Sequence, residues 1–106
     1  MSNLKHNNII CPVSKFTEML GGKWKLIIVD NIRKRGAVRF GQLAASIPGI
    51  SRKVLTDQLK ELVKSGLVKR KQYNQVPLKV EYSLSIESEN LCKIFKQIDG
   101  WVKNNF

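Results

Sequence analysis

Residues 40–66 read FGQLAASIPGISRKVLTDQLKELVKSG, and this stretch decides the fold. Its first part places apolar side chains at helical spacing, at Phe40, Leu43, Ala44 and Ile47. Pro48-Gly49 interrupts that pattern, and Ser51 and Gly66 are typical of the start and the end of a second helix. Two short helices joined by a tight turn that contains glycine predict a helix-turn-helix motif.

The second predicted helix has an apolar face and a basic face. The apolar face carries Leu55, Leu59, Leu62 and Val63, and the opposite face carries Lys53, Thr56, Asp57, Lys60 and Lys64. Arg52 and Lys53 lie in the first turn, where cations oppose the helix dipole at a cost of roughly 0.3–1 kcal/mol each. Contacts with DNA phosphates or guanine edges would offset that cost. The alternative is that a very basic chain places lysines on every solvated face.

Composition narrows the class of partner. The chain has 106 residues, a net charge of +11 and a pI of about 10.0, which suits one small domain that attracts polyanions, either nucleic acid or an anionic membrane surface. The longest aliphatic run, Leu26 to Val29, is too short to span a bilayer, which needs about 20 residues. The first eight residues lack the apolar core of a signal peptide, so we expect a flexible leader at 1–8, a single domain at 9–106 and a cytoplasmic location.

The sequence argues against an enzyme. The single histidine, His6, lies in the expected leader, and no metal-ligand spacing or carboxylate pair falls on a common face. Gly22-Lys23 does not fit a phosphate-binding loop, because Trp24 stands where serine or threonine is needed. Two cysteines, Cys11 and Cys92, do not make a disulfide framework. We expect no catalytic residues, no cofactor and no metal.

Two helices are predicted before the central stretch. Pro12 suits the first turn of a helix that ends at Gly21-Gly22, with apolar positions at Val13, Phe16, Met19 and Leu20. A second helix begins at Lys23-Trp24-Lys25 and closes with Arg33, Lys34 and Arg35, cations that suit a helix C-terminus. Its inward residues are expected to be Trp24, Ile27, Ile28 and Ile32. Residues 37–40 then form a short extended segment.

A β-hairpin is predicted after Gly66. Residues 67–73 and 79–85 alternate around a polar turn that contains Pro77. A hairpin directly after a recognition helix is the wing of a winged-helix domain, and this one carries Lys69, Arg70, Lys71 and Lys79. These cations suit phosphates or a minor groove, although lysines also protect an edge hairpin from aggregation.

The last predicted helix begins at Ser85 as cap, with Glu87 and Glu89 in its first turn. A long apolar stripe follows, formed by Leu91, Ile94, Phe95, Ile98, Trp101 and Val102. The stripe either packs on its own domain or pairs with the same helix of a second chain. In the second case Phe16 and Met19 of the first helix would join the dimer interface, and Gly100 would allow close approach of the helices.

These segments together resemble the HxlR-type family of MarR-related winged helix-turn-helix regulators. The matching segments, over roughly residues 9–104, are Cys11-Pro12-Val13, Gly22-Lys23-Trp24, Arg39-Phe40, Leu43, Pro48-Gly49-Ile50-Ser51, Leu55-Thr56, Leu59-Lys60-Glu61-Leu62, Gly66-Leu67-Val68, Pro77, Val80-Glu81-Tyr82-Ser83-Leu84 and Trp101. The resemblance implies an α+β, mainly helical winged helix-turn-helix fold, with N- and C-terminal helices that form a dimer interface. The chain differs from the usual family sequence at three places. Pro77-Leu78-Lys79 stands where Pro-Pro-Arg is usual, and Gln42 stands where an acidic residue is usual. Leu84-Ser85 with Ser88 stands where Leu-Thr and then Gly are usual.

The resemblance also implies a function: a homodimer that binds pseudo-palindromic operator DNA, with a response to electrophiles or oxidants through the cysteine of the Cys-Pro segment. The candidate DNA-binding residues are Ser51, Arg52, Lys53, Thr56, Asp57, Lys60, Arg39 and Lys79. Cys11 is the candidate sensor, since a helix N-terminus with Lys15 one turn along would lower its pKa, and Cys92 is a weaker candidate as its disulfide partner. The alternatives are a basic RNA-binding module and a winged helix that binds only proteins. The aromatic residues follow core spacing, which disfavours the RNA reading.

Overall fold

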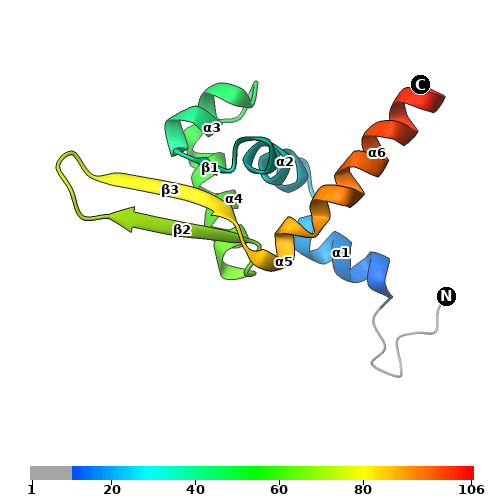
Figure 1. Ribbon diagram of the computed structural model, residues 1–106, viewed down its shortest axis with the longest axis horizontal. Helices are drawn as coiled ribbons and strands as arrows, with labels where there is room; N and C mark the ends of the chain where they lie inside the picture. The colour runs from blue at the N-terminus through cyan, green and yellow to red at the C-terminus, as the bar shows by residue number, and fades with distance from the viewer. Residues whose placement is uncertain (1–10) are drawn as a thin grey trace.

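The computed structural model describes residues 11–106, and Figure 1 shows how its elements are arranged. The expected leader at 1–8, His6 within it and the first two residues of the expected domain lie outside the described residues. In chain order the elements are α1 (Pro12–Leu20), α2 (Lys25–Arg35), β1 (Ala37–Val38), α3 (Phe40–Ser46), α4 (Arg52–Lys64), β2 (Val68–Tyr73), β3 (Lys79–Leu84), α5 (Ile86–Glu89) and α6 (Leu91–Asn105). This confirms the α+β, mainly helical class predicted from the sequence.

The helix-turn-helix consists of α3 and α4, and side-chain caps define the start of both helices. The Arg39 backbone N–H donates to Gln42 Oε1 at 2.9 Å, so Gln42 makes the contact that an acidic residue makes in a capping box. The Ser51 hydroxyl accepts from the Val54 N–H at 3.1 Å, as predicted for the cap of α4. Gly49, with φ of +82°, adopts the left-handed conformation that the turn between the helices requires.

The sheet is antiparallel with the strand order β1-β3-β2. The predicted hairpin forms β2 and β3, in a register that places Arg70 opposite Tyr82 and Tyr73 opposite Lys79. The short extended segment forms only β1, because Phe40 already begins α3. Figure 1 shows the hairpin reaching well beyond the helices, with α4 beside its base.

The core lies between α2, α4 and the base of the sheet. Its buried members are Leu20, Ile28, Val29, Ile32, Val38, Leu43, Ile47, Leu55, Leu59, Leu62, Leu67, Val68, Leu84 and Phe95. The prediction that Ile27 faces inward is wrong, since its side chain is 41% exposed while Val29 is fully buried. Neighbouring helix positions differ by about 100°, so a helix that buries Ile28, Val29 and Ile32 turns Ile27 outward.

The predicted last helix is divided into α5 and α6 by Asn90, which corrects the expectation of one continuous helix. Ser85 caps α5 through its hydroxyl, which accepts from the Ser88 N–H, and Glu87 lies in the first turn as predicted. The buried Ser88 hydroxyl donates to the Leu67 carbonyl at 2.7 Å. This bond fixes α5 to the base of the hairpin, whereas α6 continues to the C-terminus, away from the sheet (Figure 1).

None of the helices within residues 11–106 combines the length and the apolar character that a bilayer crossing demands. The same part of the chain contains no cluster of three or more His, Cys, Asp or Glu side chains arranged to hold a metal ion.

Candidate nucleic-acid interface

Helix α4 presents its basic face to solvent. Leu55, Leu59 and Leu62 are buried, whereas Arg52 and Lys60 are exposed. The Arg52 guanidinium lies 5.3 Å from the centre of the Phe40 ring on α3, a cation–π contact that positions it at the exposed start of α4. The structure therefore separates the two faces of this helix as the sequence predicted.

Lys53 and Asp57 form an ion pair one turn apart on the same face. Lys53 Nζ lies 2.9 Å from Asp57 Oδ2, and the Lys53 side chain is 85% exposed. The hydrogen bond from Lys53 lowers the pKa of the Asp57 carboxyl, and the same bond raises the pKa of Lys53. Asp57 thus holds Lys53 in the first turns of α4, and its carboxylate can also accept from a cytosine amino group.

A groove of about 380 Å³ separates α4 from the hairpin. Its polar lining includes Thr56, Lys60 and Lys64 from α4 and Arg70 and Tyr82 from the strands. Arg70 lies two residues after the buried Val68, so strand alternation places it on the face toward α4. The sequence predicts Arg70 on the wing, and its position beside α4 is an additional finding. The alternation of side chains along residues 68–70 is the signal that could have shown it.

Lys79, predicted to contact phosphate at the wing, already has partners within the hairpin. Its ammonium lies 3.5 Å from Glu81 Oε2 and 4.6 Å from the centre of the Tyr73 ring, and its side chain is only 27% exposed. The Tyr73 hydroxyl donates to Glu81 Oε1 at 2.9 Å, which lowers the pKa of Glu81 and raises that of Tyr73. The cross-strand pairing of Tyr73 with Lys79 brings these groups together.

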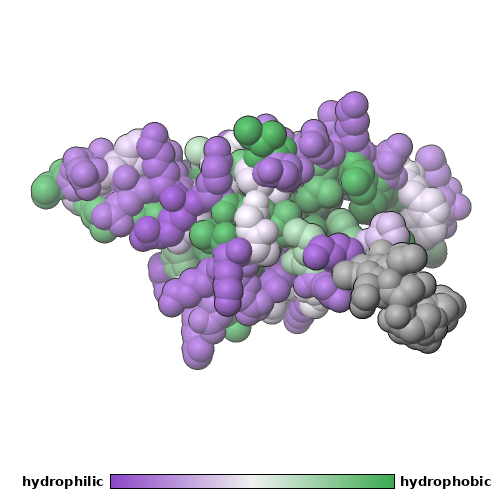
Figure 2. Space-filling view, turned by 90° about the horizontal axis from the view of Figure 1, so that it is seen from below, coloured by the Kyte–Doolittle hydropathy of each residue, from purple (hydrophilic) through white to green (hydrophobic). Residues whose placement is uncertain are grey.

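Four residues share one face of the hairpin just before its turn, and we call them the wing neck: Lys71, Tyr73, Lys79 and Glu81. Within the neck, Lys71 Nζ lies 4.8 Å from the centre of the Tyr73 ring. Beyond the neck, residues 74–78 form the wing tip. Val76 is 99% exposed and Leu78 is 61% exposed. Figure 2 shows apolar surface at the far end of the long axis, where Figure 1 places the hairpin turn.

Of the other cations discussed from the sequence, Arg39 is exposed, whereas Arg33 and Lys34 form ion pairs within α2. Arg39 is exposed at the start of α3, and its charge contributes to the lowered pKa of Glu81. Arg33 and Lys34 instead pair with Asp30 at 2.6 and 3.1 Å, which agrees with their predicted role at the end of α2.

Helices α1 and α6 share an exposed apolar face, which we call the terminal-helix face. Its exposed members are Val13 (73%), Ile94 (44%), Ile98 (45%), Trp101 (60%) and Val102 (45%). Pro12, Val13 and Phe16 of α1 meet Ile94 and Ile98 of α6 around an apolar hollow of about 290 Å³. The structure thus brings the two predicted interface helices together.

Phe95, which the sequence assigned to the dimer interface, belongs to the core instead. It is only 8% exposed, and the Arg33 guanidinium covers its ring at 5.1 Å from the centre. Leu91, Phe16 and Met19 are also partly buried against the core, so less of each is free for a partner. The apolar spacing along the sequence could not distinguish residues that pack in the core from residues that face a partner. Successive apolar positions of one helix can point to the core or to solvent.

Cys11 immediately precedes α1 and has a free thiol. The backbone N–H groups of Ser14 and Val13 lower the pKa of this thiol, which agrees with the effect predicted for a helix N-terminus. Lys15 is not among the groups that lower it.

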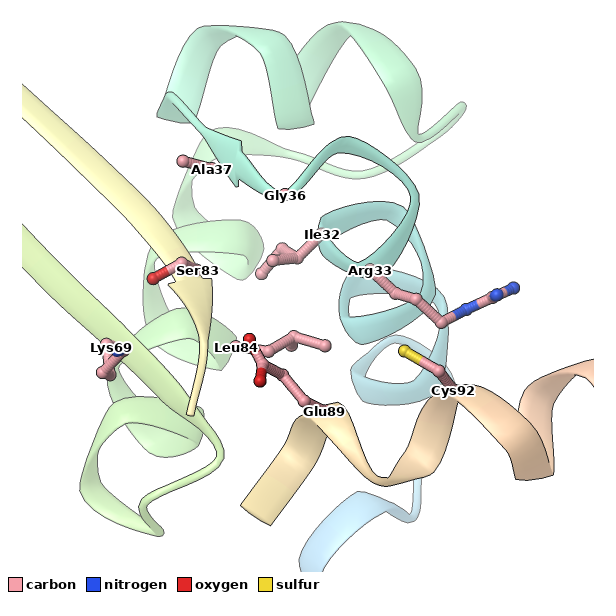
Figure 3. A pocket seen from close by; sticks show the side chains of 9 residues that line it. All are labelled: Ile32, Arg33, Gly36, Ala37, Lys69, Ser83, Leu84, Glu89 and Cys92. Atoms are coloured by element: carbon pink, nitrogen blue, oxygen red, sulfur yellow. The ribbon is translucent and has the colours of Figure 1, made fainter. Parts of the chain in front are cut away.

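Cys92 faces a different part of the molecule. Figure 3 shows its sulfur directed into a pocket of about 440 Å³ between the end of α2, the strands and α5, while the Arg33 guanidinium points away from that pocket. Pairing of Cys92 with Cys11 stays a prediction.

Comparisons with known proteins bear on this interface. The family model described as HxlR-like helix-turn-helix matches residues 19–106. The HTH-type transcriptional regulator BH0655 of Halalkalibacterium halodurans is 44% identical over 94 residues, which cover 88% of this chain and 83% of the relative. A solved structure described as a MarR-family transcriptional regulator from Porphyromonas gingivalis has a TM-score of 0.83 and 39% identity, and the match covers 100% of this chain and 98% of that one. The redox regulator HypR in its oxidized form has a TM-score of 0.81 and 40% identity, with coverage of 91% and 98%.

Proposed function

This chain belongs to the HxlR-like helix-turn-helix family of DNA-binding transcription regulators, and on that premise we propose that it binds a pseudo-palindromic operator as a homodimer. In this proposal α4 lies in the major groove of each half-site, and the hairpin contacts the adjacent backbone. Arg52, Lys53 and Thr56 contact bases or nearby phosphates, with Ser51 and Lys60 at the edges of the same surface.

The observation that carries the proposal is the exposed basic face of α4. Arg52, Lys53 and Lys60 point to solvent from a helix whose other face is fully buried. The first turn of α4 therefore presents both backbone N–H groups and cationic side chains to a polyanion. The Phe40 ring and the Asp57 carboxylate hold Arg52 and Lys53 on this face.

A binding titration against duplex DNA and single-stranded RNA, repeated at several salt concentrations, distinguishes the proposed function from its alternatives. The relatives that match are transcription regulators, a non-enzymatic class, so nucleic acid and protein partners are the ones to compare. We expect duplex DNA that contains the operator to bind far more tightly than random duplex or single-stranded RNA, with an affinity that falls steeply with salt. Equal binding of RNA and operator duplex would favour the RNA module, and no binding of either would favour a protein-interaction module.

The terminal-helix face supports the homodimer. Four large apolar side chains of α6 remain 44–60% exposed in the single chain, namely Ile94, Ile98, Trp101 and Val102. Gly100 lies among them, and within residues 11–106 a Cβ added there would meet no atom within 4 Å outside the neighbouring backbone of its own helix. Glycine inside a helix costs roughly 0.5–1 kcal/mol relative to alanine, so close approach of a second copy would explain why it is tolerated.

The salt dependence of operator binding should identify the cation of the wing that contacts phosphate. We predict that Arg70→Ala flattens the slope of log K against log salt by about 1, because Arg70 has no ion-pair partner within residues 11–106 and lines the groove beside α4. Lys79→Ala should change the slope less, since Lys79 already pairs with Glu81. A larger change for Lys79→Ala than for Arg70→Ala would show that the neck opens on DNA.

We also propose that Cys11 is a thiol switch. HypR, with 40% identity, is described as a redox regulator, and Cys11 has the lowered pKa that favours a reactive thiolate. Cys11 precedes Pro12, which lines the hollow between α1 and α6. A modification there would change the packing of the proposed dimer and with it the spacing of the two α4 helices, which must match half-sites about 34–36 Å apart.

Diamide or a quinone is therefore predicted to release operator DNA from the wild-type protein but not from Cys11→Ser, as measured by fluorescence anisotropy. Cys92→Ser serves as the matched control and should still respond to the quinone, which needs only one thiol. In that variant the alkylation of Cys11 by iodoacetamide should remain fast at pH values below the ordinary thiol pKa, since the lowered pKa preserves the thiolate there. Equal release from wild type and Cys11→Ser would remove Cys11 as the switch.

A further inference from the structure

We propose that the wing tip enters the minor groove beside each half-site as an apolar wedge, so that the protein selects operators by the deformability of the base step it meets. The wedge is Val76-Pro77-Leu78, at the turn between β2 and β3. This inference rests on the proposed function and adds to it the chemistry of the wing contact and a source of specificity.

The tip is uncharged and its apolar side chains lie in solvent. Residues 74–78 read NQVPL, without a cation in a chain of net charge +11. Val76 is 99% exposed and Leu78 is 61% exposed, and Pro77 between them is exposed as well. Such side chains gain nothing from the negative potential of a groove, but they gain from contact with sugars and with the faces of unstacked bases.

The neck braces the two strands that lead to this tip. Tyr73 and Lys79 are paired across the strands, the Tyr73 hydroxyl donates to Glu81 at 2.9 Å, and the Lys79 ammonium covers the Tyr73 ring. The two strands remain in register over six consecutive pairs up to this point. A wedge that must separate stacked bases needs a support of this kind, because a loose loop would bend instead.

Charge complementarity and position identify DNA as the occupant. The strand that leads to the tip carries the exposed cations Lys69, Arg70 and Lys71. Arg70 shares a groove with Thr56, Lys60 and Lys64 of α4, so the hairpin continues the surface assigned to the major groove. Cations along the strand and an apolar tip beyond them match a groove with phosphates at its walls and bases at its floor.

The consequence is a preference that a basic tip would not show. An inserted arginine favours the narrow minor groove of A-tracts, whereas an apolar wedge favours steps that unstack easily, such as TA and CA/TG. The DNA should also bend toward the major groove, by roughly 20° or more at each wing.

The test uses the full-length protein and three forms of its selected operator, with TA, A-tract or GC steps at the position of the wing. The wild type should prefer the TA form over the A-tract form by about ten-fold, and energy transfer between labelled DNA ends should report a bend. Val76→Ala combined with Leu78→Ala should reduce that preference to about two-fold and remove most of the bend. Leu78→Arg should shift the preference toward the A-tract form.

Ile86→Ala is the matched control, since Ile86 is 75% exposed on α5, outside the surface that we assign to DNA. It should leave preference and bend unchanged. Unchanged preference and bend in the tip variants, with operator binding intact, would overturn the wedge and leave the proposed function standing. Absence of sequence-specific duplex binding by the wild type would overturn both. Loss of binding to anionic vesicles in the tip variants, with the DNA bend unchanged, would assign the tip to a membrane and overturn the wedge.

Discussion

Replacement of both Ile94 and Ile98 by lysine is expected to convert the proposed dimer into monomers and to weaken operator binding by roughly 10²–10⁴-fold, because the second half-site is then no longer bound intramolecularly. Both side chains lie on the terminal-helix face, 44% and 45% exposed in the single chain. A lysine at either position can direct its ammonium to solvent in the monomer, but two copies would bury four charges against each other. Sedimentation velocity measures the oligomeric state directly.

Ile86→Lys is the matched control for this experiment, since Ile86 is 75% exposed on α5, away from the terminal-helix face. It should leave both the dimer and the operator affinity unchanged. Circular dichroism should show the same helix content in all three proteins, because none of the replaced side chains belongs to the buried core. An intact dimer in the doubly substituted protein would place the interface elsewhere on the surface.

Arg52→Ala should cost roughly 1–3 kcal/mol of operator binding and relax the preference at one position of each half-site, as expected for loss of a bidentate base contact. Arg52 is exposed at the first position of α4, and its guanidinium is held over the Phe40 ring at 5.3 Å. That support restricts the side chain before DNA arrives, so little conformational entropy is lost on binding. Competition with operators altered one base pair at a time measures both effects.

Arg52→Lys separates base recognition from simple charge. Lysine keeps the positive charge but lacks the planar fork that matches guanine, so it should restore the salt dependence without the full specificity. Equal losses on all sequences for Arg52→Ala would mean that Arg52 contacts only phosphate. Unchanged binding would remove Arg52 from the proposed DNA contacts.

The sequence predicted the helix-turn-helix and the hairpin because their signals are local. Ser51, Pro48-Gly49 and Gly66 specify where α4 begins and ends through contacts within a few residues. The apolar spacing of Leu55, Leu59 and Leu62 then selects the buried face without reference to the rest of the chain.

The features that were missed depend on contacts between two elements, which the pattern of one element alone does not show. Lys79 pairs with Glu81 and lies over the Tyr73 ring, and the contact with Tyr73 depends on the register of the hairpin rather than on either strand alone. Phe95 joins the core because Arg33 of α2 covers its ring, which a stripe on α6 cannot reveal. Next to the break at Asn90, Ser88 bonds to the Leu67 carbonyl, a contact across 21 positions that the local pattern of residues 85–102 does not show.

We expect two copies of the chain to place their α4 helices in successive major grooves of one operator. Selection of random duplex DNA by the purified protein, followed by sequencing of the bound fragments, tests this claim most directly. The predicted result is an enriched pseudo-palindrome whose half-sites lie about 10 base pairs apart centre to centre, or a multiple of one helical turn. Enrichment of a single asymmetric site, or of no sequence at all, would contradict it.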